Sequence, residues 1–258
     1  MPTTTVSALL RAEQAYVAQL ADAESLDHGI AFVARRFKSL DDANQFREVV
    51  IATSDEIRAV FMAVEDHFSK QGACCRVWAP AADAPIDAID SCLRQNGFTP
   101  RHFHALRVGD WLDLPTPDGL RVLPARAMRK AFDAVLLRRF NDPANPANPE
   151  RIAAAIERLN DPRTDAWVAV RDGHAAGYCT LFQVGDVARL SDVYVVDESR
   201  RTGIATAMIG HALRLARRLM FRVVATRAPI DDAAAAALLA RCGFTADGAV
   251  TEFVRTRE

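Results

Sequence analysis

A lone glycine and two arginines stand where a strand gives way to a long helix. The segment Leu190–Val196 (LSDVYVV) has the β-branched and aromatic residues of a strand, and RRTGIAT follows it at Arg200–Thr206. The first amides of a helix have no acceptor within the helix and lie at the positive end of its dipole, so they bind phosphate groups readily. Gly203 lets the backbone approach an anion, and the arginines add charge and donors. The pattern predicts a loop that binds a phosphate or pyrophosphate group.

The helix that starts in this segment is amphipathic. Its apolar residues recur at helical spacing at Ile204, Met208, Ala212, Leu215 and Leu219. One face should therefore pack on a sheet, which would hold the amino end of the helix in place. Taken alone, the glycine and the arginines also fit an ordinary strand-to-helix connection with solvated side chains, so the surrounding elements decide between the two interpretations.

Those elements are expected to alternate between strands and helices, which indicates a mixed α/β fold. A hairpin is expected over Ala166–Phe182, with Asp172 and Gly173 in its turn. Further strands are expected at Gly29–Phe37, Phe46–Thr53, Cys74–Ala79, Phe103–Val108, Leu120–Ala125, Phe221–Thr226 and Val250–Thr256. Helices are expected at Val6–Glu24, Ser54–Lys70, Ile86–Gln95, Met128–Phe140, Glu150–Leu159 and Asp231–Cys242.

The chain also contains an internal repeat. Arg76–Thr99 aligns without gaps on Arg222–Thr245, and both segments begin with Arg-Val and end with Gly-Phe-Thr. Gly109–Gly119 carries two prolines and the turn signals of a linker. We therefore expect two related domains, formed by residues 1–112 and 113–258.

The composition is that of an ordinary soluble protein. Half of the 258 residues are apolar, a quarter are charged and the net charge is −1, which argues against nucleic acid or a membrane as the main partner. Neither a secretory leader nor about 18 consecutive apolar residues can be recognised, so a cytoplasmic location is expected. The five cysteines form no C-x-x-C motif, and His102 and His104 have no further ligands nearby, so we expect no metal.

With the strand, the loop and the elements after it taken together, the sequence resembles the GCN5-related N-acetyltransferase (GNAT) superfamily. SDVYVVDESRRTGIATAMI matches that family's motif of a strand followed by R/Q-x-x-G-x-G/A. The resemblance implies the acyl-CoA N-acyltransferase fold, acetyl-CoA as co-substrate, and direct attack of an amine on the thioester. Main-chain groups of the strand would hold the pantetheine arm, and loop amides the pyrophosphate. The cofactor-binding residues would be Val193, Val195, Arg200, Arg201, Thr202, Gly203, Ile204, Ala205 and Thr206.

The residues that would move protons depart from the family pattern. Leu239 stands where many members have a tyrosine that protonates the leaving thiolate, and Asp232 replaces an asparagine that is common in the family. A thiol has a pKa of about 8.5, so transfer without a dedicated acid remains feasible. Asp192 is the candidate base or acceptor anchor, with a structural or capping role as the alternative. Tyr194 is either a substitute acid or a packing residue.

The amino-terminal copy lacks the phosphate loop. Carrying the repeat upstream places Ile57 opposite Gly203 and Ser54 opposite Arg200. We therefore expect a tandem protein whose first copy is degenerate and does not bind coenzyme A. That copy would extend the acceptor cleft or support the second copy.

The acceptor is hard to infer. In the family its specificity comes from segments that correspond here to Asn141–Pro149 and to the tail after Phe244, and neither carries a charged cluster that names a substrate. A primary amine of a small molecule is the leading expectation and a protein amine the weaker one, and a homodimer would be one way to complete the acceptor side. The alternatives are a non-catalytic acyl-CoA sensor or scaffold, and another nucleotide-binding α/β protein, for which no G-x-G-x-x-G or Walker pattern is present.

Overall fold

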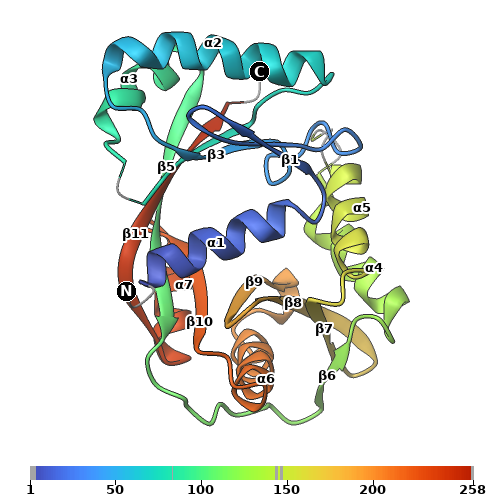
Figure 1. Ribbon diagram of the computed structural model, residues 1–258. Helices are drawn as coiled ribbons and strands as arrows, with labels where there is room; N and C mark the ends of the chain where they lie inside the picture. Colours follow the sequence, from blue (N-terminus) through green and yellow to red (C-terminus); the bar gives the residue numbers. More distant parts are fainter. Residues whose placement is uncertain (1–3, 83, 143–144, 146–147, 257–258) are drawn as a thin grey trace. The chain divides into compact units, whose positions relative to one another are not determined.

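The protein has a mixed α/β fold, which confirms the class predicted from sequence (Figure 1). The computed structural model describes residues 4–82, 84–142, 145 and 148–256. The elements up to residue 112 are α1 (Thr5–Val17), β1 (Asp22–Leu26), β2 (Gly29–Val33), β3 (Gln45–Val49), α2 (Ser54–Lys70), β4 (Val77–Pro80), α3 (Asp87–Gln95) and β5 (Phe98–Val108). The later elements are β6 (Leu120–Pro124), α4 (Arg129–Arg139), α5 (Asn148–Arg158), β7 (Thr164–Arg171), β8 (His174–Val184), β9 (Val187–Val195), the 3₁₀ turn η1 (Asp197–Ser199), α6 (Ile204–Arg218), β10 (Val223–Pro229), α7 (Ala233–Arg241) and β11 (Phe244–Arg255).

Contacts divide the chain into two compact units. Unit 1 contains the chain up to Ala12 and His104–Gly248, and unit 2 contains Glu13–Phe103 together with the end of the chain from Ala249. Each unit thus takes a terminal segment from the far end of the sequence. The divisions fall at three places, after residues 12, 103 and 248, whereas the sequence suggested one boundary at residue 112.

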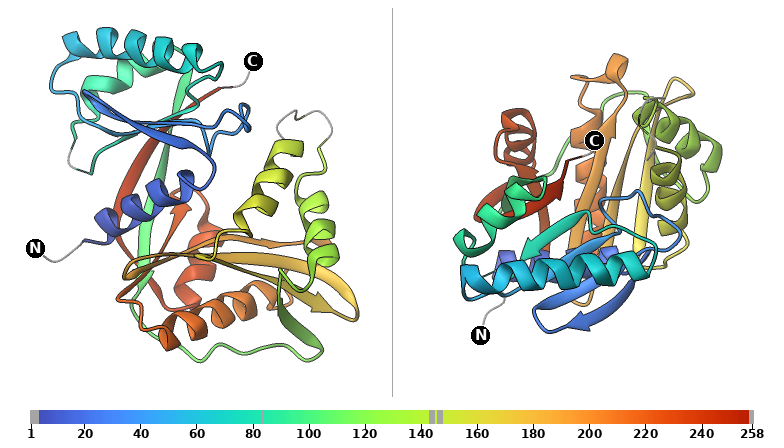
Figure 2. Two further views of the ribbon diagram at one scale, coloured as in Figure 1. Left: turned by 45° about the vertical axis from the view of Figure 1, so that its right-hand side comes forward. Right: turned by 90° about the horizontal axis from the view of Figure 1, so that it is seen from above.

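Unit 1 is built on strands in the order β5-β10-β9-β8-β7-β6. From β6 to β9 each strand is antiparallel to its neighbour, and β9 and β10 are parallel. Helices α4 and α5 cover one face of the β7–β9 region, and α6 covers the other (Figures 1 and 2). Met208 and Ala212 of α6 and Phe132 of α4 are buried in its core, as the apolar spacing of α6 predicted.

The predicted hairpin in unit 1 is confirmed. Asp172 and Gly173 connect β7 to β8 and have φ angles of 50° and 80°. Two consecutive residues with positive φ form the turn whose twist matches that of paired strands, and an Asp-Gly pair accommodates it at low cost.

Unit 2 has strands in the order β1-β2-β3-β4-β11, with α2 and α3 packed on each other. Its core centres on Trp78, whose ring lies 4.9 Å from the ring of Phe46 and 5.8 Å from that of Phe61. The buried side chain of Phe253, near the end of the chain, joins the same core. The last strand of this unit is therefore supplied by the carboxyl-terminal part of β11, which pairs antiparallel with β4.

The repeat predicted from sequence corresponds to two strand–helix–strand segments, β4-α3-β5 and β10-α7-β11. The strand after each helix does not pair with the strand before it in the sheet order, because β11 lies next to β4 and β5 lies next to β10. The two segments have thus exchanged their last strands, which explains why each unit needs residues from both halves of the sequence.

The helix predicted over Val6–Glu24 is wrong at its end. Helix α1 stops at Val17, and Asp22–Leu26 forms β1, which pairs with β2 around the turn at Asp27 and His28. Four of the five β1 residues are exposed, so the strand shows no alternation of apolar and polar residues. Strand β1 is held by its pairing with β2, and the pattern of apolar residues in the sequence could not reveal it.

Candidate active site

A gap opens between β9 and β10 in unit 1. The parallel ladder joins Val187–Arg189 of β9 to Val223–Ala225 of β10, and both strands then continue, to Val195 and to Pro229. Main-chain groups of strands that separate in this way can bind an extended ligand much as they would bind another strand. Val193 and Val195 lie in the part of β9 beyond the ladder, where the sequence predicted the pantetheine arm.

A bulge fixes the course of β9 at this point. The register between β8 and β9 shifts between Tyr178 and Thr180, and Asp192 on the bulged strand has a φ of 55°. Left-handed backbone costs about 1 kcal/mol for a residue other than glycine, so it persists only where other contacts hold it. Gly177 allows the close approach of β8, since a Cβ there would lie 2.4 Å from the carbonyl oxygen of Tyr194.

The side chain of Asp192 is held by a helix and a strand. Arg139, in the last turn of α4, donates a hydrogen bond of 2.9 Å from Nη1 to Asp192 Oδ1 and also contacts the hydroxyl of Tyr178. The hydroxyl of Thr180 lies 3.2 Å from Asp192 Oδ2. Both carboxylate oxygens therefore have partners, and these contacts stabilise the bulge.

The ion pair is charged at neutral pH. Burial acts to raise the pKa of Asp192, whose side chain is 27% exposed, but the positive charges of Arg139, Arg158 and Arg189 outweigh it and lower the pKa to about 2. Burial acts to lower the pKa of Arg139, and the charge of Asp192 more than offsets this and raises it. A general base works best with a pKa near the working pH. Asp192 is far below that range, which favours the structural alternative over the base.

Aromatic rings surround the guanidinium of Arg139. Its Cζ lies 5.3 Å from the ring centre of Tyr178, 5.8 Å from that of Tyr194 and 5.1 Å from that of Phe140. Cations over aromatic faces are stabilised by the ring quadrupole. Tyr194 therefore has a packing role in this cluster, and its role as an acid stays a prediction.

The loop after β9 contains two left-handed residues directly before α6. Arg201 and Gly203 have φ angles of 64° and 83°, and the left-handed Gly203 is the N-cap of α6. Left-handed residues in such a turn can direct backbone N–H groups toward an anion, and the first amides of α6 have no acceptor within the helix. Residues 201–203 are exposed. Arg200 donates from Nε to the carbonyl of Val195 (3.3 Å) and pairs with Asp197 (2.7 Å), so its side chain links the loop to the end of β9.

The two positions in α7 that depart from the family pattern have structural roles. Leu239 is 6% exposed and belongs to the core of unit 1. Asp232 caps the helix, because its Oδ1 accepts a hydrogen bond of 2.9 Å from the amide of Ala235. Neither side chain supplies a proton donor in the place of the missing tyrosine.

The corresponding region of unit 2 is closed. The β3–β4 ladder extends to Val49 and Pro80, the last residues of the two strands. Glu48 has a φ of 55° at a register shift, like Asp192, but α2 begins soon afterwards at Ser54. Ile57 lies within α2 and is buried in the core of unit 2. The segment of unit 2 that corresponds to the phosphate loop is thus shorter than that loop and also has different residues. The gapless repeat alignment could not show the difference in length.

Sequence reasoning missed Arg139, Tyr178 and Thr180. They surround Asp192 only in the folded chain, and Arg139 stands 53 residues before it. In the predicted acceptor segment Asn141–Pro149, four residues lie outside the described part of the chain: Pro143, Ala144, Pro146 and Ala147.

None of the helices described is long and apolar enough to span a bilayer. Where the structure describes the chain, His, Cys, Asp and Glu side chains form no group of three or more that could hold a metal ion.

Several solved structures have folds similar to that of this chain. No curated protein matches the sequence. A protein of unknown function from Staphylococcus epidermidis has a similar fold, with a TM-score of 0.74 and 12% identity over 92% of this chain and 95% of that one. A GCN5-related N-acetyltransferase from Kribbella flavida has a TM-score of 0.68 and 13% identity over 100% of this chain and 97% of that one.

A tandem GNAT protein from the clavulanic acid biosynthesis pathway is also similar, with a TM-score of 0.54 and 18% identity over 76% of this chain and 68% of that one. At these identities the likeness concerns the fold alone. The sequence evidence comes from the model of the acetyltransferase (GNAT) family, which matches residues 129–244 and so includes α4, the bulge and the loop before α6. Residues 129–244 are a domain of the acetyltransferase (GNAT) family.

Proposed function

We propose that the protein is an acetyl-CoA-dependent N-acetyltransferase that acetylates a primary amine of a small molecule. The observation that carries this proposal is the separation of β9 from β10, which leads directly to the left-handed residues Arg201 and Gly203 at the amino end of α6. An acyl-pantetheine arm and a pyrophosphate need these two features next to each other, an unpaired strand edge and an anion nest.

The residues of unit 1 fit coenzyme A. Main-chain groups of Val193 and Val195 would hold the pantetheine arm, and the amides of Arg201 to Thr206 would hold the pyrophosphate. A Cβ at Gly203 would lie 3.1 Å from Cγ of Pro117, and the backbone there is left-handed, so this position is suited to glycine. Arg201 adds an exposed positive charge at the same place, whereas the charge of Arg200 is paired with Asp197.

The transfer itself requires little from side chains. The amine nitrogen attacks the thioester carbon, a C–N bond forms, the C–S bond breaks, and the thiol leaves with a proton. A main-chain amide of β9 near the bulge would donate to the oxygen as its negative charge develops. The proton released by the amine would pass to water, since Asp192 is paired with Arg139 and has a pKa of about 2. Asp192 would act by holding the bulge, and through it the main chain of Val193.

Unit 2 would support unit 1 or extend the acceptor side. The β3–β4 ladder, which extends to the ends of both strands, and the early start of α2 support the proposal that it binds no coenzyme A. The acceptor class, a homodimer and a cytoplasmic location stay predictions.

The second candidate is a non-catalytic acyl-CoA sensor or scaffold. Leu239, buried in the core at the position of the usual acid, favours it. Release of free thiol from acetyl-CoA, measured with a panel of small primary amines and with lysine-containing peptides, separates the two. Turnover with at least one small amine supports the enzyme, turnover with peptides alone would overturn the small-molecule acceptor, and saturable binding of acetyl-CoA without turnover on any amine would favour the sensor.

A further inference from the structure

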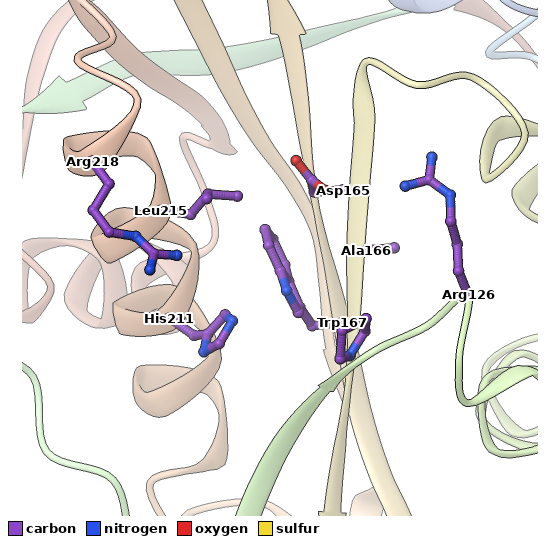
Figure 3. A pocket seen from close by; sticks show the side chains of 8 residues that line it. Arg126, Asp165, Ala166, Trp167, His211, Leu215 and Arg218 are labelled. Carbon is purple, nitrogen blue, oxygen red and sulfur yellow. The ribbon is translucent and has the colours of Figure 1, made fainter.

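A hollow lies in unit 1, beside the carboxyl-terminal half of α6 (Figure 3). It has a volume of about 280 Å³ and is formed between α6 and the start of β7. Its lining includes Asp165, Ala166, Trp167, His211, Leu215 and Arg218. A neighbouring hollow of about 530 Å³ shares His211 and Arg218 and is also lined by Arg214 and Arg217. The α6 residues that line the two hollows begin at His211. The phosphate loop precedes Ile204, at the other end of the helix.

One wall of this hollow is apolar and aromatic. The rings of Trp167 and His211 lie 5.2 Å apart at an angle of 65°, and Leu215 stands one helical turn after His211 (Figure 3). Trp167 is 5% exposed, so its ring is fixed by the core. Burial and the charges of Arg214 and Arg218 lower the pKa of His211, which favours the neutral imidazole. A flat apolar group can therefore pack against this wall without meeting a charge.

The rim is strongly cationic. Arg214, Arg217 and Arg218 are exposed and follow each other at helical spacing, where like charges repel. Among the described residues, these three guanidinium groups have no hydrogen bond or ion pair. The helix dipole favours cations in the last turn, at Arg217 and Arg218, but it does not account for the adjoining hollow.

The other charged groups of the lining are already engaged. Arg126 donates to the carbonyl oxygens of Leu159 and Thr164, at 2.8 and 2.9 Å. Asp165 accepts a hydrogen bond of 2.6 Å from Gln183. The groups of the rim that can still donate hydrogen bonds to a ligand are therefore the guanidinium groups of Arg214, Arg217 and Arg218.

We propose that this hollow binds a small organic anion. Its planar apolar part would pack against Trp167 and Leu215, and its carboxylate or phosphate would pair with Arg218 and Arg214. The site is separate from the proposed acyl-donor site, and it holds whether or not unit 1 is an acetyltransferase.

Three probes test this proposal on the full chain by isothermal titration calorimetry. Phenyl phosphate carries both the ring and the negative charge, inorganic phosphate carries the charge alone, and benzylamine carries the ring with a positive charge. With coenzyme A added at saturation to occupy the loop around Gly203, phenyl phosphate should bind saturably at one site per chain. Inorganic phosphate should bind at least about tenfold more weakly, and benzylamine not measurably. Arg218→Gln should weaken phenyl phosphate about tenfold. The control Arg121→Gln removes an exposed arginine of β6 that lines neither hollow, and binding should stay unchanged.

Any of three results would overturn the proposal. The first is the absence of saturable phenyl phosphate binding, and the second is binding of benzylamine with equal affinity. The third is equal affinity of the Arg218→Gln variant and the parent protein for phenyl phosphate, which would place the anion elsewhere on the chain. Arg218 is exposed, so its replacement leaves the core intact, and thermal unfolding of each variant verifies this.

Discussion

Arg139 Nη1 donates a hydrogen bond of 2.9 Å to Asp192 Oδ1 and so joins the last turn of α4 to the bulge of β9. The pair connects a helix end to the strand whose main chain is proposed to hold the thioester. A residue that acts in this way determines where the strand lies, and it need not exchange a proton with the substrate.

The first prediction concerns catalysis. Asp192→Asn and Arg139→Met should each lower kcat by up to about 10²-fold, because the main chain near Val193 shifts. The affinity for coenzyme A should fall less than kcat, because the amides of Arg201 to Thr206 that would hold the pyrophosphate stay in place. The double variant should be about as slow as the slower single variant, since both changes remove one interaction. Steady-state kinetics across pH measure this, and the profile should keep its shape.

The matched control is Arg129→Met, which breaks an exposed pair with Asp133 in the same helix and should leave kcat unchanged. If Asp192→Asn abolished turnover at every pH while Arg139→Met behaved like the parent protein, Asp192 would be the base and the positioning role would be wrong.

The second prediction concerns acid stability. The pKa of Asp192, about 2 in the folded protein, lies below the ordinary value of about 4, so the stabilisation it provides is full above pH 4 and is lost as the pH falls toward 2. Asp192→Asn should therefore destabilise the protein by about 2 kcal/mol at pH 7, and the difference should shrink between pH 4 and pH 2. Urea unfolding at several pH values measures it, with Asp133→Asn as the exposed control. A difference that is the same at pH 7 and at pH 2.5 would contradict the ion pair.

The third prediction separates binding from backbone strain. Gly203→Ala and Gly173→Ala both place a side chain on left-handed backbone, with φ angles of 83° and 80°. Both should cost about 1 kcal/mol of stability. Only Gly203→Ala should weaken coenzyme A, by about tenfold or more, because its Cβ enters the loop and meets Pro117. Calorimetric affinities test this, and equal affinities for the two variants would show that the loop does not bind the pyrophosphate.

The fourth prediction concerns the exchanged strand in unit 2. Arg47 pairs with Glu252 of β11 at 3.1 Å, and the two side chains are 2% and 6% exposed. Glu252→Leu leaves a buried charge without this partner and should cost about 3–5 kcal/mol, whereas combining it with Arg47→Met should recover most of the loss. Asp90→Asn, which breaks an exposed helical pair with Arg94, should cost about 0.5 kcal/mol or less. Chemical denaturation of the three variants compares them, and a mild effect of Glu252→Leu would refute the buried pair.

Local features of the fold were predictable from sequence. Helix α2 runs from Ser54 to Lys70 as predicted, because the acidic residues Asp55 and Glu56 mark its first turn and Gly72, with a positive φ, follows its end. The turn of the β7–β8 hairpin and the glycine before α6 were also predictable, because backbone with a positive φ favours glycine and aspartate.

Features that depend on distant contacts were not predictable. The role of Arg139 depends on a partner 53 residues away, and a polar residue at a helix end carries no signal of that partner. The pairing of β11 with β4 is equally invisible, because the repeat pattern records the order of the elements and not their neighbours in the sheet. The strand Asp22–Leu26 was missed because most of its residues are exposed.

The central claim is that the chain binds acetyl-CoA at one site, in unit 1. Isothermal titration of the full-length protein with acetyl-CoA measures it most directly. The account predicts one molecule per chain, with binding lost or strongly weakened in Gly203→Ala. Two molecules per chain, or no binding at all, would contradict it.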